Sequence, residues 1–196
     1  MKIEASMLIA LVVSTLVGAE ESVPMRTLYD FDGRAESKNW RSVNDTVMGG
    51  RSHGGSRVFP EEGWLQFSGT LSLKNRGGFA SIRSVAKSHD LTGFVGIALR
   101  VRGDGRRYLF NVHTDQIPYG GSYRAEFATK KDEWLTIHMP FVALRPTFHG
   151  RYLPKAPAIN LRQVTSVGLT LADKREGRFK VEVDWLKAYR GFNRQK

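Results

Sequence analysis

Apolar and polar side chains alternate along most of this chain, and that alternation restricts its fold more than any other feature of the sequence. In one such stretch, Val95, Ile97 and Leu99 would share a single face of a strand. Beyond residue 25, no window of ten or more residues keeps the period of an amphipathic helix. The stretches typical of strands are 27–31, 56–59, 64–74, 78–84, 94–102, 106–114, 121–128, 135–139, 165–171 and 179–185. About ten strands with glycine-rich turns predict an all-β protein, an antiparallel β-sandwich or barrel.

Length and composition limit the chain to one sizeable core. Two full domains would be cramped in 196 residues, and no internal repeat or interdomain linker is visible. The absence of cysteine excludes disulfides, thiolate metal sites and a cysteine nucleophile. Lys+Arg number 30 against 19 Asp+Glu, and the net charge of +11 favours contact with polyanions or acidic surfaces.

The N-terminal segment has the pattern of an export signal. An apolar run over 7–19 follows Lys2, and it is too short for a membrane span, which takes about 20 residues. The run ends in the small residues 17–19, which resemble a cleavage site. We therefore expect a signal peptide over 1–19 and a single β-sandwich domain over 20–196. The protein would be exported, either periplasmic or secreted, with no transmembrane span in the mature chain.

A two-residue turn at Asp104-Gly105 predicts a hairpin between 94–102 and 106–114. In that register Val101 faces Tyr108, so all the apolar side chains lie on one side. If the following strands continue as a meander, the opposite side becomes a polar face. Further along the chain, 140–158 indicates a long irregular connection, and 160–163 indicates a short helical turn.

The polar face of this predicted meander is a candidate ligand-binding surface. Tryptophan can stack on a sugar ring, and Arg, Glu and Asn can bind hydroxyl or anionic groups. A solvated sheet face with interspersed charges is the alternative interpretation. The candidate residues are Arg100, Arg102, Arg107, Asn111, Arg124, Glu126 and Trp134.

The glycine-rich loop 39–55 is the second candidate, as a structural cap or as a recognition element. Asn44 and Asp45 can accept hydrogen bonds from backbone N–H groups two residues on, and nested N–H groups could bind an anion. We expect the loop to be ordered, with Asp45 meeting backbone donors or an arginine such as Arg83. Met48 would plug a gap at the end of the sandwich. Gly49 and Gly50 would supply backbone conformations that other residues avoid.

No catalytic constellation is recognisable in the sequence. The five histidines lack the spacing of a zinc site, and there is no G-x-S-x-G nucleophile pattern. We therefore expect no catalytic residues, no metal site and no cofactor. The arginines are scattered from 26 to 194 without a basic tract, so we expect no specific recognition of nucleic acid.

Several blocks of sequence, in order along the chain, resemble the complex I intermediate-associated protein family. The resemblance runs from about 28 to 189 and is carried by Trp40 with 43–52, 67–73, 77–83, 99–108, Trp134 with 139–141, 168–174 and 184–186. It implies a galactose-binding-domain-like jelly roll. It also implies a chaperone-like accessory role in assembly of the NADH:ubiquinone oxidoreductase.

Three functions follow as hypotheses. The first is a non-catalytic binding domain that acts on a protein partner, such as a respiratory-complex subunit. The second is an exported carbohydrate-binding module that uses the predicted polar face to bind a glycan. The third is non-specific electrostatic binding to polyanions, including peripheral contact with acidic surfaces.

Overall fold

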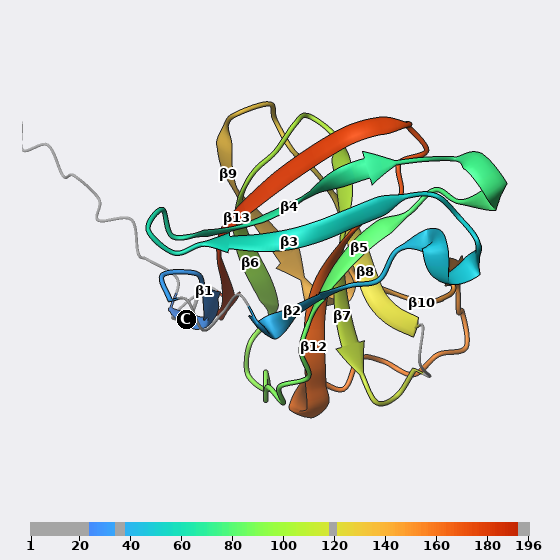
Figure 1. Cartoon of the computed structure of the whole chain (residues 1–196). Helices are drawn as coiled ribbons and strands as arrows, with labels where there is room; N and C mark the ends of the chain where they lie inside the picture. Colours follow the sequence, from blue (N-terminus) through green and yellow to red (C-terminus); the bar gives the residue numbers. More distant parts are fainter. Residues whose placement is uncertain (1–23, 34–37, 118–120, 192–196) are drawn as a thin grey trace, which may run out of the picture.

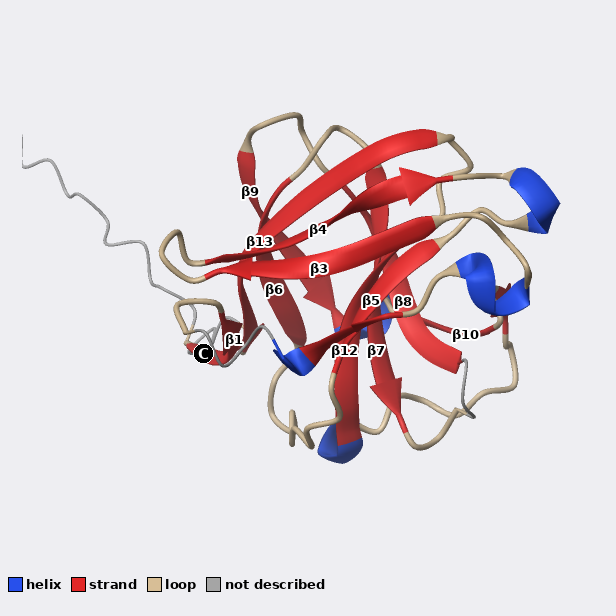
Figure 2. Cartoon of the chain, in the orientation of Figure 1, coloured by secondary structure: helices blue, strands red, loops and turns tan. Residues whose placement is uncertain are grey.

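Two antiparallel β-sheets packed face to face form the molecule (Figures 1 and 2). The computed structural model describes residues 24–33, 38–117 and 121–191. Sheet A has the order β3-β4-β13-β6-β9, with β1 also paired to β13. Its strands are β1 (Met25–Asp30), β3 (His53–Phe59), β4 (Trp64–Leu71), β6 (Gly96–Arg102), β9 (Trp134–Pro140) and β13 (Gly177–Tyr189).

Sheet B has the order β11-β10-β8-β7-β12-β5-β2. Its strands are β2 (Trp40–Ser42), β5 (Ala80–Ser84), β7 (Arg107–Thr114), β8 (Gly121–Ala128), β10 (Arg145–Phe148), β11 (Arg151–Tyr152) and β12 (Val164–Leu171). The loops between the strands contain short 3₁₀ turns, named η2 (Asp45–Met48), η3 (Lys74–Arg76), η4 (Phe141–Ala143) and η5 (Leu161–Gln163).

The core lies between the sheets and is built from the alternating apolar side chains of both. Phe67 and Val181 of sheet A and Tyr108 and Phe110 of sheet B are at most 1% exposed. The Phe67 ring meets Tyr108 edge-on across the sandwich, with ring centres 6.5 Å apart. The period-2 pattern thus places its apolar side in the core, and the predicted antiparallel sandwich is confirmed.

The predicted irregular connection over 140–158 contains two strands. β10 pairs with β8, and β11 pairs with β10 in turn, so this segment extends the edge of sheet B. The pairing is short, with two to four residues in each strand, which is too little sequence for an alternation to be visible. The helical turn expected at 160–163 is present as η5.

The predicted hairpin between β6 and β7 is wrong, because the two strands belong to different sheets. β6 pairs with β13 and β9 in sheet A, whereas β7 pairs with β8 and β12 in sheet B. Residues 103–106 therefore form a corner by which the chain crosses from one sheet to the other. Strands on either side of the core present their apolar faces inward, so the alternation alone does not distinguish a hairpin from a crossing.

A buried ion pair fixes this corner. Arg106 is 6% exposed, and its Nε and Nη2 donate to the two carboxylate oxygens of Asp173 at 2.9 and 2.6 Å. The same guanidinium donates to the carbonyl groups of Arg175, just before β13, and of Arg178, within it. Hydrogen bonding to Asp173 raises the pKa of Arg106, although burial opposes its charge. The corner is thereby tied to the connection between β12 and β13.

We expect Arg106→Met to destabilise the fold by about 3–5 kcal/mol, because it leaves the Asp173 carboxylate buried without its partner. The neighbouring Arg107→Met is the matched control. Arg107 pairs with Glu126 at the surface, where the side chains are 57% and 47% exposed, and its loss should cost less than about 1 kcal/mol. Urea unfolding of both variants measures the difference. Equal effects would contradict the role of the corner.

Candidate functional site

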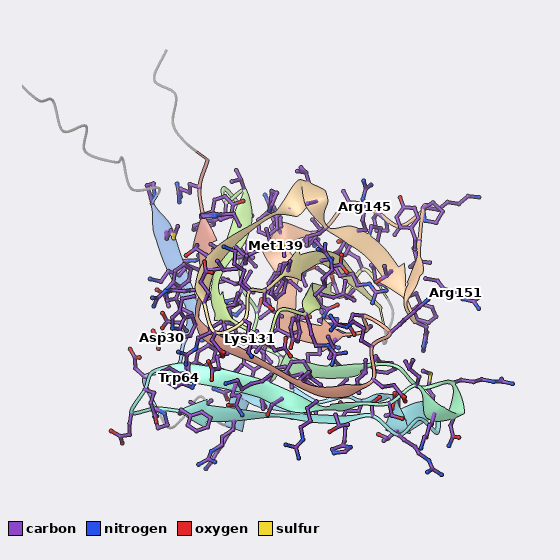
Figure 3. The ribbon with its side chains drawn as sticks, turned by 90° about the horizontal axis from the view of Figure 1, so that it is seen from above. Asp30, Trp64, Lys131, Met139, Arg145 and Arg151 are labelled. Atoms are coloured by element: carbon purple, nitrogen blue, oxygen red, sulfur yellow. The ribbon has the colours of Figure 1, made fainter. Side chains whose placement is uncertain are left out.

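The seven predicted ligand-binding residues are divided between two sheets. Arg100, Arg102 and Trp134 lie on the outer face of sheet A, and the other four belong to β7 and β8 of sheet B. One continuous polar face is therefore not formed. Figure 3 places Trp64 of sheet A and Arg145 of sheet B on opposite sides of the molecule. Each face is described separately below.

On sheet B, strand register aligns one outward-facing position from each of six neighbouring strands. Each member pairs directly with the next, and paired residues of antiparallel strands share a face. We call this set the arginine row. Its members, in order across the sheet, are Arg41, Arg83, Gly168, Asn111, Arg124 and Arg145.

The middle of the arginine row is polar and closely packed. Asn111 is only 6% exposed although it lies on the outer side of the sheet. Its amide donates to Thr170 Oγ1 at 3.0 Å, and its carbonyl oxygen accepts from Ser122 Oγ at 3.3 Å. Beside it, a Cβ on Gly168 would lie 2.5 Å from the carbonyl oxygen of Ile82, so this position has no room for a side chain. Strands and hydrogen bonds thus hold the middle of the row rigidly.

The arginines of the row lie in a positively charged setting. Arg83 Nε donates to Ser166 Oγ at 2.7 Å, and Arg124 Nη2 donates to the carbonyl oxygen of Gly150 at 2.8 Å. Burial lowers the pKa of Arg124. Burial, together with the charge of Arg83, lowers the pKa of the neighbouring His113 to about 4. His113 is therefore neutral at pH 7, and its Nδ1 donates to the Gly121 carbonyl at 2.9 Å.

Arg107 and Glu126 lie on the same face as the row, with Glu126 two residues from Arg124 on β8 and Arg107 four residues from Asn111 on β7. The Arg107 guanidinium and the Glu126 carboxylate form an ion pair at 2.7 Å. Glu126 is therefore already engaged by Arg107, and its charge is balanced there. This pair borders the arginine row without neutralising it.

The outer face of sheet A carries two tryptophans and two arginines, which we call the tryptophan–arginine ladder. Its members are Trp64, Arg100, Arg102 and Trp134. The guanidinium of Arg102 lies 5.1 Å from the ring centre of Trp64 and 4.8 Å from that of Trp134. Arg102 also donates to Glu182 at 2.5 Å, and Arg100 pairs with Asp184. Cation–π contacts and ion pairs therefore hold these side chains in place. The ladder is a preorganised surface whose charges are largely balanced.

The loop that holds η2 is built around the buried carboxylate of Asp45, which is 1% exposed. Its oxygens accept from the backbone N–H groups of Ser52, Gly78 and Phe79 at 2.8, 2.6 and 3.3 Å. Burial opposes ionisation, but these hydrogen bonds outweigh it and lower the pKa of Asp45. The donors to Asp45 are thus backbone groups, whereas Arg83, suggested as its partner, belongs to the arginine row. Figures 1 and 2 together show η2 and η3 next to each other at one end of the sandwich.

Two expectations for this loop need correction. Met48 does not plug a gap, because its side chain is 62% exposed, and Val47 beside it is 71% exposed. The backbone conformation that favours glycine is adopted by Gly49, at φ 83°, rather than by both glycines. Gly50 is needed for a different reason, because a Cβ there would lie 2.4 Å from Asp45 Cγ.

We expect Gly50→Val to destabilise the fold by about 1–3 kcal/mol, because the new side chain displaces the Asp45 carboxylate from its backbone donors. Gly33→Val is the matched control, since nothing lies within 4 Å of a Cβ at that position. Thermal or urea unfolding measures both. If Gly50→Val melts like the wild type but loses partner binding, the loop is a recognition element and the structural role of Asp45 is refuted.

Within the described ranges, no group of three or more His, Cys, Asp or Glu side chains is placed to hold a metal ion. Over the same ranges, no helix has the length and apolar character needed to cross a bilayer.

Sequence reasoning missed three members of the arginine row. Arg41, Gly168 and Arg145 belong to strands whose pairing partners lie far away in the sequence. It also missed Trp64, which lies beside Arg102 on sheet A, and the ion pair that Arg102 forms with Glu182. Register between distant strands leaves no signal in a single sequence, so these neighbours became visible only in the fold.

Solved structures with a similar fold include carbohydrate-binding modules. One, from family 11 and part of a cellulosomal cellulase of Clostridium thermocellum, matches with a TM-score of 0.68 and 17% identity over 87% of this chain and 96% of that chain. A family 30 module from a cellulosomal cellulase of the same bacterium has a TM-score of 0.54 and 12% identity, over 79% and 92%. Identities this low show the fold alone. They confirm the predicted jelly-roll sandwich as the fold of this chain.

The family is shown by sequence. The family model of Complex I intermediate-associated protein 30 (CIA30) matches residues 29–183. The chain therefore belongs to this family, as the resemblance predicted. A relative from Caenorhabditis elegans, named as a probable mitochondrial complex I intermediate-associated protein 30, is 27% identical over 84% of this chain and 54% of its own length. The Mus musculus protein of that name is 25% identical over 82% and 55%. The chain spans about half the length of these curated relatives.

The predicted export is contradicted by these relatives. The nematode, mouse and Neurospora crassa proteins are all named as mitochondrial, which points to mitochondria rather than to the periplasm or the outside of a cell. The segment interpreted as a signal peptide, 1–19, lies outside the described residues. An apolar N-terminal run was therefore an unreliable indicator of destination.

Proposed function

We propose that this protein is a non-catalytic accessory factor that binds a protein partner during assembly of complex I. The observation that carries the proposal is the family match over 29–183, which includes strands of both sheets. Relatives that match more than four-fifths of this chain are named for association with complex I intermediates. An accessory role agrees with a sandwich whose arginine row and tryptophan–arginine ladder lie on the outer faces of the two sheets.

The two sheet faces support protein binding on physical grounds. Arginine and tryptophan are enriched at the energetic centres of protein interfaces, and both residue types are concentrated here on rigid strands. The side chains of the tryptophan–arginine ladder are preorganised, so docking would cost little additional side-chain entropy.

Deletion of the gene from cells that make this chain should lower the amount of fully assembled complex I and leave partly assembled species. Blue native electrophoresis with an in-gel NADH oxidation stain measures both. Re-expression of the wild-type chain should restore the complex, and the destabilised Arg106→Met variant should restore it less well than Arg107→Met. Unchanged complex I after deletion would contradict the proposal.

Carbohydrate binding is a second candidate, favoured by two tryptophan rings on the outer face of sheet A. Trp64 and Trp134 lie with ring centres 6.2 Å apart, in a fold shared with carbohydrate-binding modules. Two guanidinium groups already lie within 5.0 Å of the Trp134 ring centre, which leaves less of that ring for a sugar. The ladder therefore favours glycan binding less strongly than the family favours a protein partner.

A glycan array probed with the wild-type chain, with Trp134→Ala and with Tyr152→Ala tests this second candidate. Tyr152 is 56% exposed on β11 at the edge of sheet B, which makes it a matched aromatic control. Glycan binding through the ladder would be lost in Trp134→Ala and kept in Tyr152→Ala. An array without signal, or a signal that Trp134→Ala leaves unchanged, rules out this site.

A further inference from the structure

The arginine row has charged ends and a polar middle. Arg41 and Arg83 are adjacent at one end, and Arg124 and Arg145 are adjacent at the other. Gly168 and Asn111 lie between the two pairs. Paired strands are about 4.8 Å apart, so the three strand spacings from Arg83 to Arg124 amount to about 14 Å. The row therefore presents two cationic positions separated by a fixed distance.

The positive charge of the four arginines in the row favours binding of an anionic group. Arg124 is partly desolvated, its guanidinium donates to a backbone carbonyl, and burial lowers its pKa. His113, next to Arg83, is held neutral. Glu126 is the carboxylate nearest along β8, and it is paired with Arg107. A ligand that brings carboxylates to both ends would form charge-assisted, two-pronged contacts with the guanidinium groups.

An extended polypeptide has the spacing that the row requires. Its side chains alternate between two faces and rise about 3.3 Å per residue, so residues i and i+4 lie on one face about 13 Å apart. Acidic residues at those positions would match the separation of Arg83 and Arg124. No long side chain stands between the two ends of the row, because Gly168 has none and the Asn111 amide is held by Thr170 and Ser122.

Nucleic acid and neutral sugar fit the row less well. Both classes of ligand commonly stack on aromatic rings, and none of the six members of the row is aromatic. The tryptophans that could stack are on the other sheet. The row itself offers charge without a stacking platform, and the exposed ring of Tyr152 lies beyond its Arg145 end, so the row favours an acidic peptide.

We propose that the arginine row binds an extended acidic segment of a protein partner, with carboxylates four residues apart. The inference rests on the proposed function, since it names the docking surface and the chemistry of the partner. It assigns the interaction to sheet B and leaves the tryptophan–arginine ladder outside the interface.

Titration of the full chain with octaglutamate at low ionic strength, followed by calorimetry, tests the proposal. Arg41→Gln/Arg145→Gln removes the two exposed ends of the row, whereas Arg57→Gln/Arg178→Gln removes the same charge from exposed positions on sheet A. The row variant should bind at least about tenfold more weakly than wild type. The control should stay within about twofold of wild type, because exposed charges far from the ligand are screened.

The ring resonances of His113 provide a second readout that binding elsewhere would not move. Carboxylates at the row should raise the pKa of His113 from about 4, while the ring resonances of His53, on the other sheet, should not shift. Equal weakening in both variants, or an unchanged His113, would overturn the proposal. Binding of an oligothymidylate or of heparin through the row, without binding of octaglutamate, would overturn it too.

Re-expression of the row variant in the deletion cells separates this inference from the proposed function. Reduced rescue of complex I by the row variant, with full rescue by the sheet A control, supports the inference. If both variants rescue complex I fully, the inference fails and the assembly role stands. If deletion itself leaves complex I unchanged, the assembly role fails, and octaglutamate binding alone then decides the chemistry of the row.

Discussion

The buried pair between Arg106 and Asp173 fixes the corner on which the rest of the structure depends. At that corner the chain leaves sheet A and enters sheet B, so β6 and β7 lie on opposite sides of the core. Gly103 permits the close approach, because a Cβ there would lie 2.4 Å from Thr129. Asp104 adds to the restraint by accepting from the Tyr108 hydroxyl and from the backbone of Lys180. This crossing decides which arginines share a face.

Local patterns were sufficient to predict the class of fold. Alternation of side chains identifies the side of a strand that faces the core, and it did so for Val101 and Tyr108, which are both fully buried. The same alternation does not say in which sheet a strand lies, because both sheets bury their apolar side. The hairpin prediction failed at that point, and the single polar face failed with it. The arginine row depends on pairing between strands far apart in sequence, which one sequence does not record.

The glycine-rich loop shows the same division between local and non-local information. An Asx residue beside glycines indicated a fixed turn, and Asp45 is indeed held by backbone donors. The donors at residues 78 and 79 come from a different part of the chain, and Met48 is exposed rather than packed into the end of the sandwich. The structure thus has three distinct surfaces: the arginine row, the tryptophan–arginine ladder and the loop that holds η2. Family membership, rather than any one contact, favours a protein partner.

Photo-crosslinking inside cells tests most directly which surface meets that partner. Benzoylphenylalanine would replace Tyr152, an exposed residue on β11 beside the Arg145 end of the row, in one variant and Arg57 on the outer face of sheet A in another. The account predicts cross-links to a complex I subunit or assembly intermediate from position 152 and none from position 57. Cross-links from position 57 alone, or from neither position while the chain still co-purifies with complex I proteins, would contradict it.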